Sequence, residues 1–420
     1  MSKLISKVGE GGKGNISFET IQDFCFFLYL MATTAHQTGE GFDAIFIRAS
    51  FVLFLGFSVL QMILENYFKW NSFISWFLLF LGYGYLSTLW AADTVVVGQY
   101  TNTFIQMVGC IICLSNRIKK FEDIDKYITM IVYSLAYTVL ILLIKTPSDA
   151  WGTERIGMEI GIHSNAVGFR LAMGVLLALY LAMYRKKKFF FAFVVLFVAI
   201  TLYTGSRKGI IILMSGLTLY PLISSNKKIV GKEIINFIIK LILIIIALVV
   251  VIYLVSNNEI FYNIIGHRLE TMFEYFSGDV NADSSIAERN FFIAKAVELF
   301  KANPILGYGM NNFKVYMNEI NYHHQTFSHN NFVELLSTLG LVGFTIYYWM
   351  IVRIIIDCFK LFFKKTIDHP RNVVLIAIIL IEVLTSWWNM SYINEFSMVL
   401  YVLIYLNNKI SLEALKNEHN

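Results

Sequence analysis

A histidine and a carboxamide stand together at His329-Asn330, at the end of a polar stretch and directly before an apolar run. Gly340 and Gly343 follow within that run, about one helical turn apart. An unperturbed histidine pKa near 6.5 suits a general base, and Asn330 could orient the ring by a hydrogen bond. The two glycines would let another helix approach closely. These residues predict a proton acceptor at a membrane surface; an interfacial histidine beside ordinary helix packing is the plain alternative.

Four arginines fall in segments that we expect on the same side of the membrane as His329. They are Arg155, Arg207, Arg268 and Arg289. A cation near hydrocarbon costs roughly 2.5–3.5 kcal/mol at a helix centre, so it is usually paired or functional. The planar guanidinium suits a phosphate or diphosphate, although each arginine could instead reach toward lipid headgroups. The sequence alone does not say whether the four meet in space.

Apolar runs recur along the whole chain and define the elements that must position these residues. Hydrophobic residues make up 57% of the sequence and charged residues 15%, which excludes an ordinary soluble domain. Runs of about 15–25 residues match the length of a membrane-spanning helix. We predict an all-α, polytopic membrane protein of about twelve spans. The predicted spans are 21–35, 44–63, 73–90, 95–114, 126–145, 163–184, 189–204, 209–224, 236–255, 331–355, 372–390 and 393–407.

The distribution of positive charge predicts the orientation of these spans. Loops on the amino-terminal side of the membrane hold 20 Lys and Arg residues, and loops on the other side hold 8. The positive-inside rule therefore places both termini in the cytoplasm and a long loop between spans nine and ten outside. The predicted divisions are a tail at 1–20, spans one to nine at 21–255, the loop at 256–330, spans ten to twelve at 331–407, and a tail at 408–420.

Motifs for nucleotides and metals are missing from the sequence. No Walker-type loop or G-x-G-x-x-G is present, so ATP or dinucleotide use is not indicated, and the net charge of +5 reflects topology, not nucleic-acid binding. Asp123-Ile-Asp125 has the D-x-D form of sugar-nucleotide transferases, but its lysine neighbours indicate a solvated, cytoplasmic charged face. We therefore predict no metal site and no cofactor.

The segment from Arg289 to Gly343 resembles a known family. It holds an arginine, a helical stretch ending at Asn303-Pro304, a Gly307-Tyr-Gly309 turn, and the pattern H-[NSQ]-x9-G-x-x-G at 329–343. This order is similar to the O-antigen ligase and Wzy-type polysaccharide polymerase superfamily. Upstream, Ser206-Arg207 and Asn165 with Gly168 resemble the starts of two of its spans. The resemblance covers residues 155–343.

The resemblance implies a metal-independent, inverting glycosyltransferase on the outer face of a bacterial cytoplasmic membrane. Its donor would be an oligosaccharide on undecaprenyl diphosphate. His329 would be the general base, and Arg289 and Arg207 would neutralise charge on the leaving diphosphate. Arg155, Arg268, Asn330 and Asn165 would bind substrate. Membrane lipids, a flippase and a chain-length regulator would be further partners.

Three functions remain open at this point. A polymerase joins lipid-linked repeat units into capsular, exo- or O-antigen polysaccharide, whereas a ligase transfers the glycan to another acceptor. We favour the polymerase because the Lys, Asn, Ile and Phe content is compatible with a Gram-positive capsule or exopolysaccharide producer. A flippase or transporter is the alternative from another class. Transporters usually carry polar residues at mid-membrane, whereas polarity here is concentrated in one loop.

Overall fold

The computed structural model describes residues 17–36, 41–224, 258, 262–278, 283–319, 326–364 and 369–417. The predicted ninth span, 236–255, lies outside the described residues. Within them the chain is helical and contains no strand. The helices are α2 (Phe18–Ala35), α3 (Phe42–Leu64), α4 (Ser72–Leu86), α5 (Thr94–Val97), α6 (Thr101–Arg117), α7 (Phe121–Lys145), α8 (Ser164–Met183), α9 (Phe190–Tyr203), α10 (Arg207–Ser224), α13 (His267–Phe276), α14 (Ser284–Ala302), α15 (Phe313–Glu319), α16 (Asn331–Phe363), α17 (His369–Thr385) and α18 (Glu395–Asn417).

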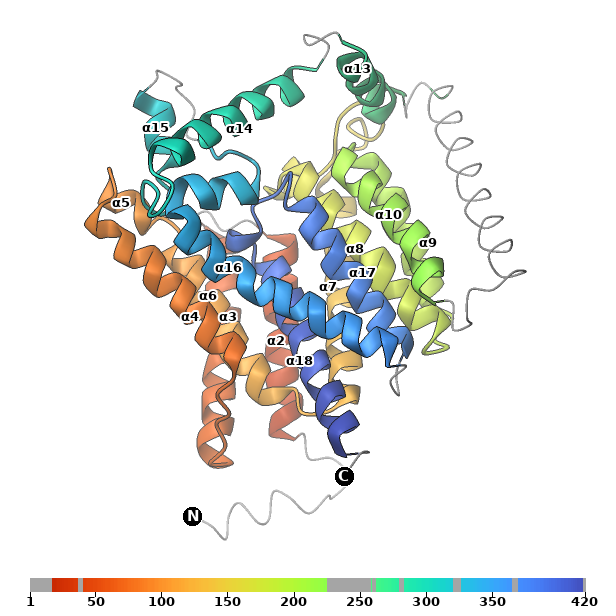
Figure 1. Ribbon diagram of the computed structural model, residues 1–420. Helices are drawn as coiled ribbons and strands as arrows, with labels where there is room; N and C mark the ends of the chain where they lie inside the picture. Colours follow the sequence, from red (N-terminus) through yellow and green to blue (C-terminus); the bar gives the residue numbers. More distant parts are fainter. Residues whose placement is uncertain are drawn as a thin grey trace.

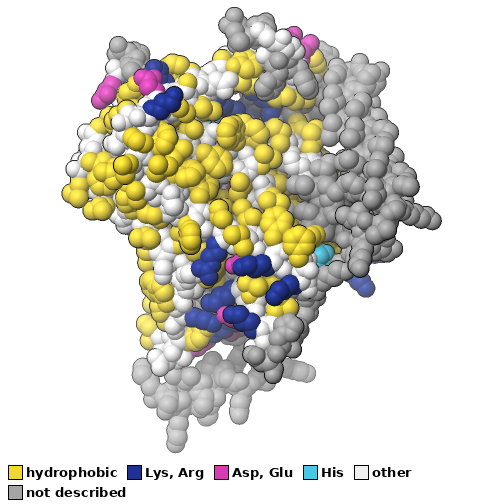
Figure 2. All heavy atoms as spheres, viewed as in Figure 1, with side chains coloured by type: hydrophobic (Ala, Val, Ile, Leu, Met, Phe, Trp, Pro, Cys, Tyr) yellow, Lys and Arg dark blue, Asp and Glu magenta, His cyan; other side chains and the backbone are white. Residues whose placement is uncertain are grey.

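Seven described helical segments are long and apolar enough to cross a membrane, and α9 is a shorter apolar helix. Large apolar side chains also face outward on them, among them Val52, Leu79 and Trp349. Hydrophobic side chains cover the middle of the face seen in Figure 2. A soluble protein rarely exposes so continuous an apolar surface, so lipid is its natural solvent. The all-helical, multi-pass membrane fold expected from the sequence is thus confirmed, while the number of twelve spans stays a prediction.

The two ends of the helix bundle differ. The start of α2 and the end of α18 lie at the lower end in Figure 1, and α14 lies across the upper end, where α10 and α16 begin. The sequence predicts 256–330 as a long outer loop with a helical stretch that ends at Asn303-Pro304, and α14 is that helix. The described part of this segment contains α13, α14 and α15. Helix α14 packs on α16, and its buried Phe292, Ala296 and Leu299 cluster with Phe313 and Met317 of α15 and with Val333 of α16.

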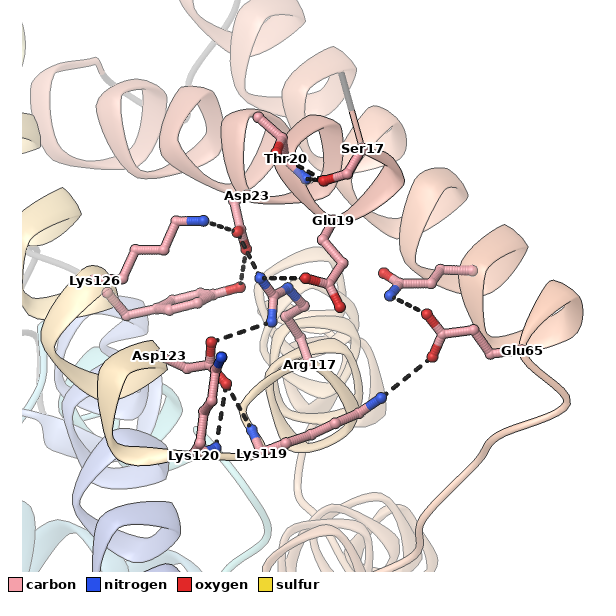
Figure 3. Close-up of polar contacts among 12 residues, drawn as sticks. Ser17, Glu19, Thr20, Asp23, Glu65, Arg117, Lys119, Lys120, Asp123 and Lys126 are labelled. Atoms are coloured by element: carbon pink, nitrogen blue, oxygen red, sulfur yellow. Dashed lines mark hydrogen bonds and ion pairs between the residues drawn. The ribbon is translucent and has the colours of Figure 1, made fainter. Parts of the chain in front are cut away.

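The lower end is held by buried ion pairs around Arg117, at the end of α6 (Figure 3). Its guanidinium lies 2.7 Å from Asp23 of α2 and 3.4 Å from Asp123 of α7. Asp123 is 5% exposed and also accepts hydrogen bonds from the backbone N–H groups of Lys119 and Lys120. The solvated charged face expected at Asp123-Ile-Asp125 is therefore wrong for Asp123. Its carboxylate joins the start of α7 to Arg117 of α6, which in turn pairs with Asp23 of α2. The D-x-D spacing alone could not reveal that role.

A break in α16 shapes the upper end. Gly340 has φ 62° and ψ −168°, which interrupts the helix after about two and a half turns. The break frees the carbonyls of Ser337 and Thr338, which accept hydrogen bonds from Tyr308 N at 3.0 Å and Gly309 N at 2.8 Å. The N–H of Leu341 in turn donates to Pro304 O at 2.8 Å. The 304–309 turn is thereby built into the helix, and the two segments satisfy each other's backbone hydrogen bonds.

The two glycines of the 329–343 pattern thus have different roles. A Cβ on Gly340 would lie 2.2 Å from the carbonyl oxygen of Ile305, so the close approach there is by a turn and not by a helix. Gly343 does face a helix as expected, because an added Cβ would lie 3.0 Å from the ring of Tyr83 in α4. Tyr83 also donates to the carbonyl of Leu339 at 3.2 Å.

Candidate functional site

A polar cavity of about 380 Å³ opens at the upper end of the bundle and collects most of the residues singled out from the sequence. His329, Arg289, Arg155 and Asn165 all line it. They come from four separate segments: the turn before α16, the first half of α14, the α7–α8 connection and the start of α8. Folding therefore brings together in one cavity His329 and two of the arginines, which lie far apart in the sequence.

His329 directly precedes the capping residue of α16 and has an uncommon backbone conformation. Its φ is 55°, the left-handed region that only a few residue types, histidine among them, enter with any frequency. The imidazole Nε2 lies 3.4 Å from Thr326 Oγ1, and its ring centroid lies 6.0 Å from that of Phe292 in α14. Thr326, and not Asn330, is thus the polar neighbour of the ring among the described residues.

Asn330 is fully buried and does not line the cavity. Its Oδ1 caps α16 by accepting hydrogen bonds from Phe332 N at 2.9 Å and Val333 N at 3.3 Å. Buried Glu334 reaches back to accept from Ser328 N at 2.8 Å. These contacts fix the backbone on both sides of His329. The structure therefore places Asn330 where it can position the histidine rather than touch a ligand.

The surroundings of His329 lower its pKa from 6.5 to about 4. Burial is the largest cause, because it penalises the charged imidazolium, and the positive charges of Arg289 and Lys208 act in the same direction. The imidazole is therefore neutral at physiological pH and has a lone pair available for a proton. A bound anion that compensates these charges would raise the pKa again.

Arg155 and Arg289 make the cavity cationic, and Lys208 adds only part of a charge, because burial and the charge of Arg289 lower its pKa to about 7. Two hydrogen bonds hold the Arg155 side chain: its Nε donates to Thr204 O at 2.9 Å and its Nη2 to Asn165 Oδ1 at 2.8 Å. Burial and the neighbouring arginines lower the pKa of both Arg155 and Arg289. Lys208 donates to the carbonyl oxygen of Trp388. Like charges gathered at one site cost free energy unless an anion joins them, so the arrangement suits an anionic ligand.

Arg207 and Arg268 are placed differently. Arg207 is 9% exposed, does not line the cavity, and forms a two-pronged ion pair with Asp283, the residue that caps α14. It thus ties the start of α10 to the start of α14. Arg268 belongs to α13, but its side chain lies outside the described residues.

Five of the described helices begin at this cavity, which adds a further positive potential. His163 caps α8, Lys208 and Ser285 are the second residues of α10 and α14, and His329 and Asn394 stand just before the caps or starts of α16 and α18. A helix N-terminus carries about half a positive charge and exposes unpaired N–H groups. Several of them around one cavity favour a phosphate-like anion.

The sequence reasoning missed several residues of this cavity. They are His163, Lys208, Glu288, Asn389 and Asn394. Lys208 directly follows Arg207, and the polar residues His163 and Asn394 mark the starts of apolar runs, so each carried a weak signal. Only the tertiary structure brings these short connections together.

Fold and site together define a multi-pass membrane protein with a cationic, histidine-containing cavity at one end of its bundle. The family model for O-antigen ligase matches residues 192–348, which run from α9 to the part of α16 just beyond its break. The resemblance to the O-antigen ligase and Wzy-type superfamily is confirmed over this segment. It includes His329, Arg289 and Arg207, whereas Arg155 and Asn165 lie before it. No curated protein matches the sequence.

Proposed function

We propose that this protein is a membrane glycosyltransferase that polymerises oligosaccharide repeat units carried on undecaprenyl diphosphate into capsular, exo- or O-antigen polysaccharide. The observation that carries the proposal is the cavity in which neutral His329 stands beside Arg155, Lys208 and Arg289 at a group of helix N-termini. The family match supports an enzyme of the ligase or polymerase kind. A general base next to an anion site is what transfer from a lipid diphosphate requires.

The reaction is a single displacement at the anomeric carbon of the donor. The acceptor hydroxyl oxygen forms the new glycosidic bond while the bond from the anomeric carbon to the diphosphate oxygen breaks, so the configuration inverts. His329 takes the hydroxyl proton, and the electron pair of the broken bond leaves on the diphosphate. Arg155 and Arg289 stabilise the charge that grows on the leaving group. The energy comes from the donor, so no nucleotide or metal takes part.

Substrate binding and base strength are coupled in this scheme. In the free protein Arg289 and Lys208 hold the pKa of His329 low. A diphosphate bound between these cations cancels much of their field, and the pKa of His329 rises toward a value better matched to neutral pH. The histidine becomes an effective base only when the donor is in place.

The other residues support these two groups. Asn165 orients Arg155, Asn330 fixes the backbone of His329, and Arg207 holds α14 through Asp283 so that Arg289 faces the cavity. Arg268 we assign to the diphosphate or to the lipid headgroups beside it. A flippase that supplies the donor and a chain-length regulator would be partners of the same process.

We place the cavity on the outer face of the bacterial cytoplasmic membrane, with both termini inside. The excess of positive charge in the loops at the opposite end supports this orientation. A ligase would use the same displacement with a different acceptor. The choice of polymerase rests on composition alone.

Replacing His329 by alanine tests the proposal in cells of the source bacterium. We expect His329→Ala to abolish long-chain polysaccharide while lipid-linked repeat units accumulate on the outer face at a normal protein level. His267→Ala is the matched control, because His267 is an exposed histidine of α13 that does not line the cavity. Polymer of normal length from His329→Ala would refute the assignment of the base.

A further inference from the structure

A second cavity of about 380 Å³ adjoins the first and is not used by the chemistry above. It lies between the end of α2, the start of α6, the α7–α8 connection and the start of α18. Three residues line both cavities, namely His163, Asn389 and Asn394. The two cavities are therefore neighbours, separated by the side chains that line both.

Arg170 and Glu395 face each other's charge across this second cavity without forming an ion pair. Arg170 donates through Nη1 to Thr34 O at 3.0 Å, but its buried Nε has no hydrogen-bond partner among the described residues. Glu395 Oε2 accepts a hydrogen bond from the Tyr29 hydroxyl at 3.5 Å, and its buried Oε1 likewise has no hydrogen-bond partner among the described residues. Both side chains line the cavity and are only partly buried, so a ligand there can meet their charged groups.

The chemistry of these two side chains selects the ligand. A hydroxyl group both donates and accepts hydrogen bonds, so a polyol can satisfy Glu395 and Arg170 at once. A fully ionised diphosphate ester cannot, because it has no proton to offer the carboxylate and is repelled by it. Tyr100, Met390 and Ile393 supply apolar surface for the C–H face of a sugar ring. Arg170 also lies almost two turns inside an apolar helix, where an ionisable residue is usually functional.

We propose that this second cavity is a saccharide subsite, in which Glu395 and Arg170 hold the hydroxyl groups of an uncharged sugar. The subsite rests on the proposed function, since it assigns the diphosphate to the first cavity and the sugar to the second. The sugar could belong to the acceptor or to the donor, because both present the same hydroxyl chemistry. The shared wall of His163, Asn389 and Asn394 is then the place where sugar and diphosphate meet.

The test separates recognition of sugar from recognition of diphosphate. The substrate is the lipid-linked oligosaccharide isolated from a strain that lacks this protein, and the sugar-free probe is undecaprenyl diphosphate used as an inhibitor. We expect Glu395→Gln and Arg170→Gln each to raise the KM for the oligosaccharide at least about tenfold, as for loss of a hydrogen bond to a charged group. The Ki of undecaprenyl diphosphate should stay unchanged. Arg289→Gln should raise both constants.

Glu382→Gln is the matched control, because Glu382 is a buried carboxyl group of α17 that lines neither cavity, and both constants should keep their wild-type values. To identify the sugar's source, the delipidated oligosaccharide serves as acceptor with a labelled lipid-linked donor. A higher KM for the acceptor alone assigns the subsite to the acceptor, and a higher KM for the donor alone assigns it to the donor.

Two results would overturn the subsite. One is an unchanged KM for both substrates in the Glu395 and Arg170 variants, and the other is a Ki for undecaprenyl diphosphate that rises as much as the KM. Both results are comparisons with wild type, so they can be obtained only if the wild-type protein is active in the assay. A wild-type protein that makes no product from these substrates would instead contradict the proposed function itself.

Discussion

At the scale of single residues, the proposed mechanism depends on a histidine that burial and neighbouring positive charges keep neutral. Burial, Arg289 and Lys208 all oppose protonation of His329, so its pKa is about 4 instead of 6.5. The same cations are the natural partners of a diphosphate. In the proposed mechanism, the base strength of His329 is therefore a property of the complex with the donor and not of the free protein.

This coupling predicts two different acid limbs in the pH profile. The base must be neutral, and the free protein keeps it neutral down to its low pKa, so kcat/KM should stay level to about pH 5 and fall toward about pH 4. Bound diphosphate raises the pKa, so the limb of kcat should lie at higher pH. Initial rates between about pH 4 and about pH 8 measure both.

Arg289→Gln supplies the control for this profile. Removal of one cation should move the limb of kcat/KM to higher pH, because a positive charge that lowers the pKa of His329 is lost. A wild-type kcat/KM that already falls near the ordinary histidine pKa of about 6.5 would contradict a depressed pKa in the free protein.

The sequence indicated single residues well where they stood in a recognisable pattern. His329 and Arg289 belong to the 289–343 pattern, and both line the cavity, together with Arg155 and Asn165. Asn330 was expected near the ligand, but its side-chain amide caps the start of α16. Arg207 was expected at the diphosphate, but it forms an ion pair with Asp283. Arg170 and Glu395 gave no signal that set them apart, because each stands alone in or beside an apolar run.

At the scale of elements, the break in α16 and the 304–309 turn form one unit that aims the start of α16 at the cavity. Gly340 and Gly307 both have positive φ. An added Cβ would lie 2.2 Å from the backbone of the other segment at Gly340 and 2.5 Å from it at Gly307. The unit thus depends on two glycines at once, which explains why both accompany the histidine in one pattern.

Gly340→Ala should therefore damage both stability and activity. The added Cβ would lie 2.2 Å from Ile305 O at a φ that alanine rarely adopts, which should lower the free energy of unfolding by at least about 2 kcal/mol. Thermal unfolding in detergent measures this loss. Gly82→Ala is the control, since nothing lies within 4 Å of its added Cβ in α4. Equal unfolding temperatures for the two variants would refute the role of the break.

The ion pair between Arg207 and Asp283 joins the start of α10 to the start of α14. If Arg207 acts by anchoring α14, Arg207→Gln and Asp283→Asn should each lower activity, because removing one partner of a buried pair costs about 3–5 kcal/mol. The asparagine introduced in place of Asp283 would keep the cap on α14. The double variant should be no worse than either single one, since the lost interaction is the same.

Activity of the three variants decides between anchoring and direct contact. If Arg207 instead touches the diphosphate, Asp283→Asn should remain near wild type while Arg207→Gln loses activity. That outcome would return Arg207 to the catalytic group that the family resemblance implied.

Elements were the most predictable level of the fold. Long apolar runs have few ways to satisfy their backbone in lipid, so each predicted span within the described residues is helical over most of its length, although 95–114 is divided between α5 and α6. The packing of α14 on α16 was not predictable, because an amphipathic segment in a long loop does not specify its partner. The buried Asp123 was misjudged for a related reason, since its ion-pair partner Arg117 lies at the end of another helix, α6.

At the scale of the whole molecule, the bundle separates two kinds of charge. Buried ion pairs around Arg117 join three helices at the end where α2 begins, and the cationic cavity with its neighbouring polar cavity lies at the other end. An apolar surface lies between them (Figure 2). A lipid-linked substrate could thus keep its chain in the membrane while its diphosphate and sugars enter the two adjoining cavities.

Reconstitution with lipid-linked repeat units as the only substrate tests the central claim most directly. Purified wild-type protein should convert them into a ladder of products on a gel, without nucleotide or metal, and His329→Ala should yield none. Product that appears only when a second acceptor is added would assign the protein as a ligase. An equal ladder from wild type and His329→Ala, or no product from wild type with any acceptor, would contradict the account.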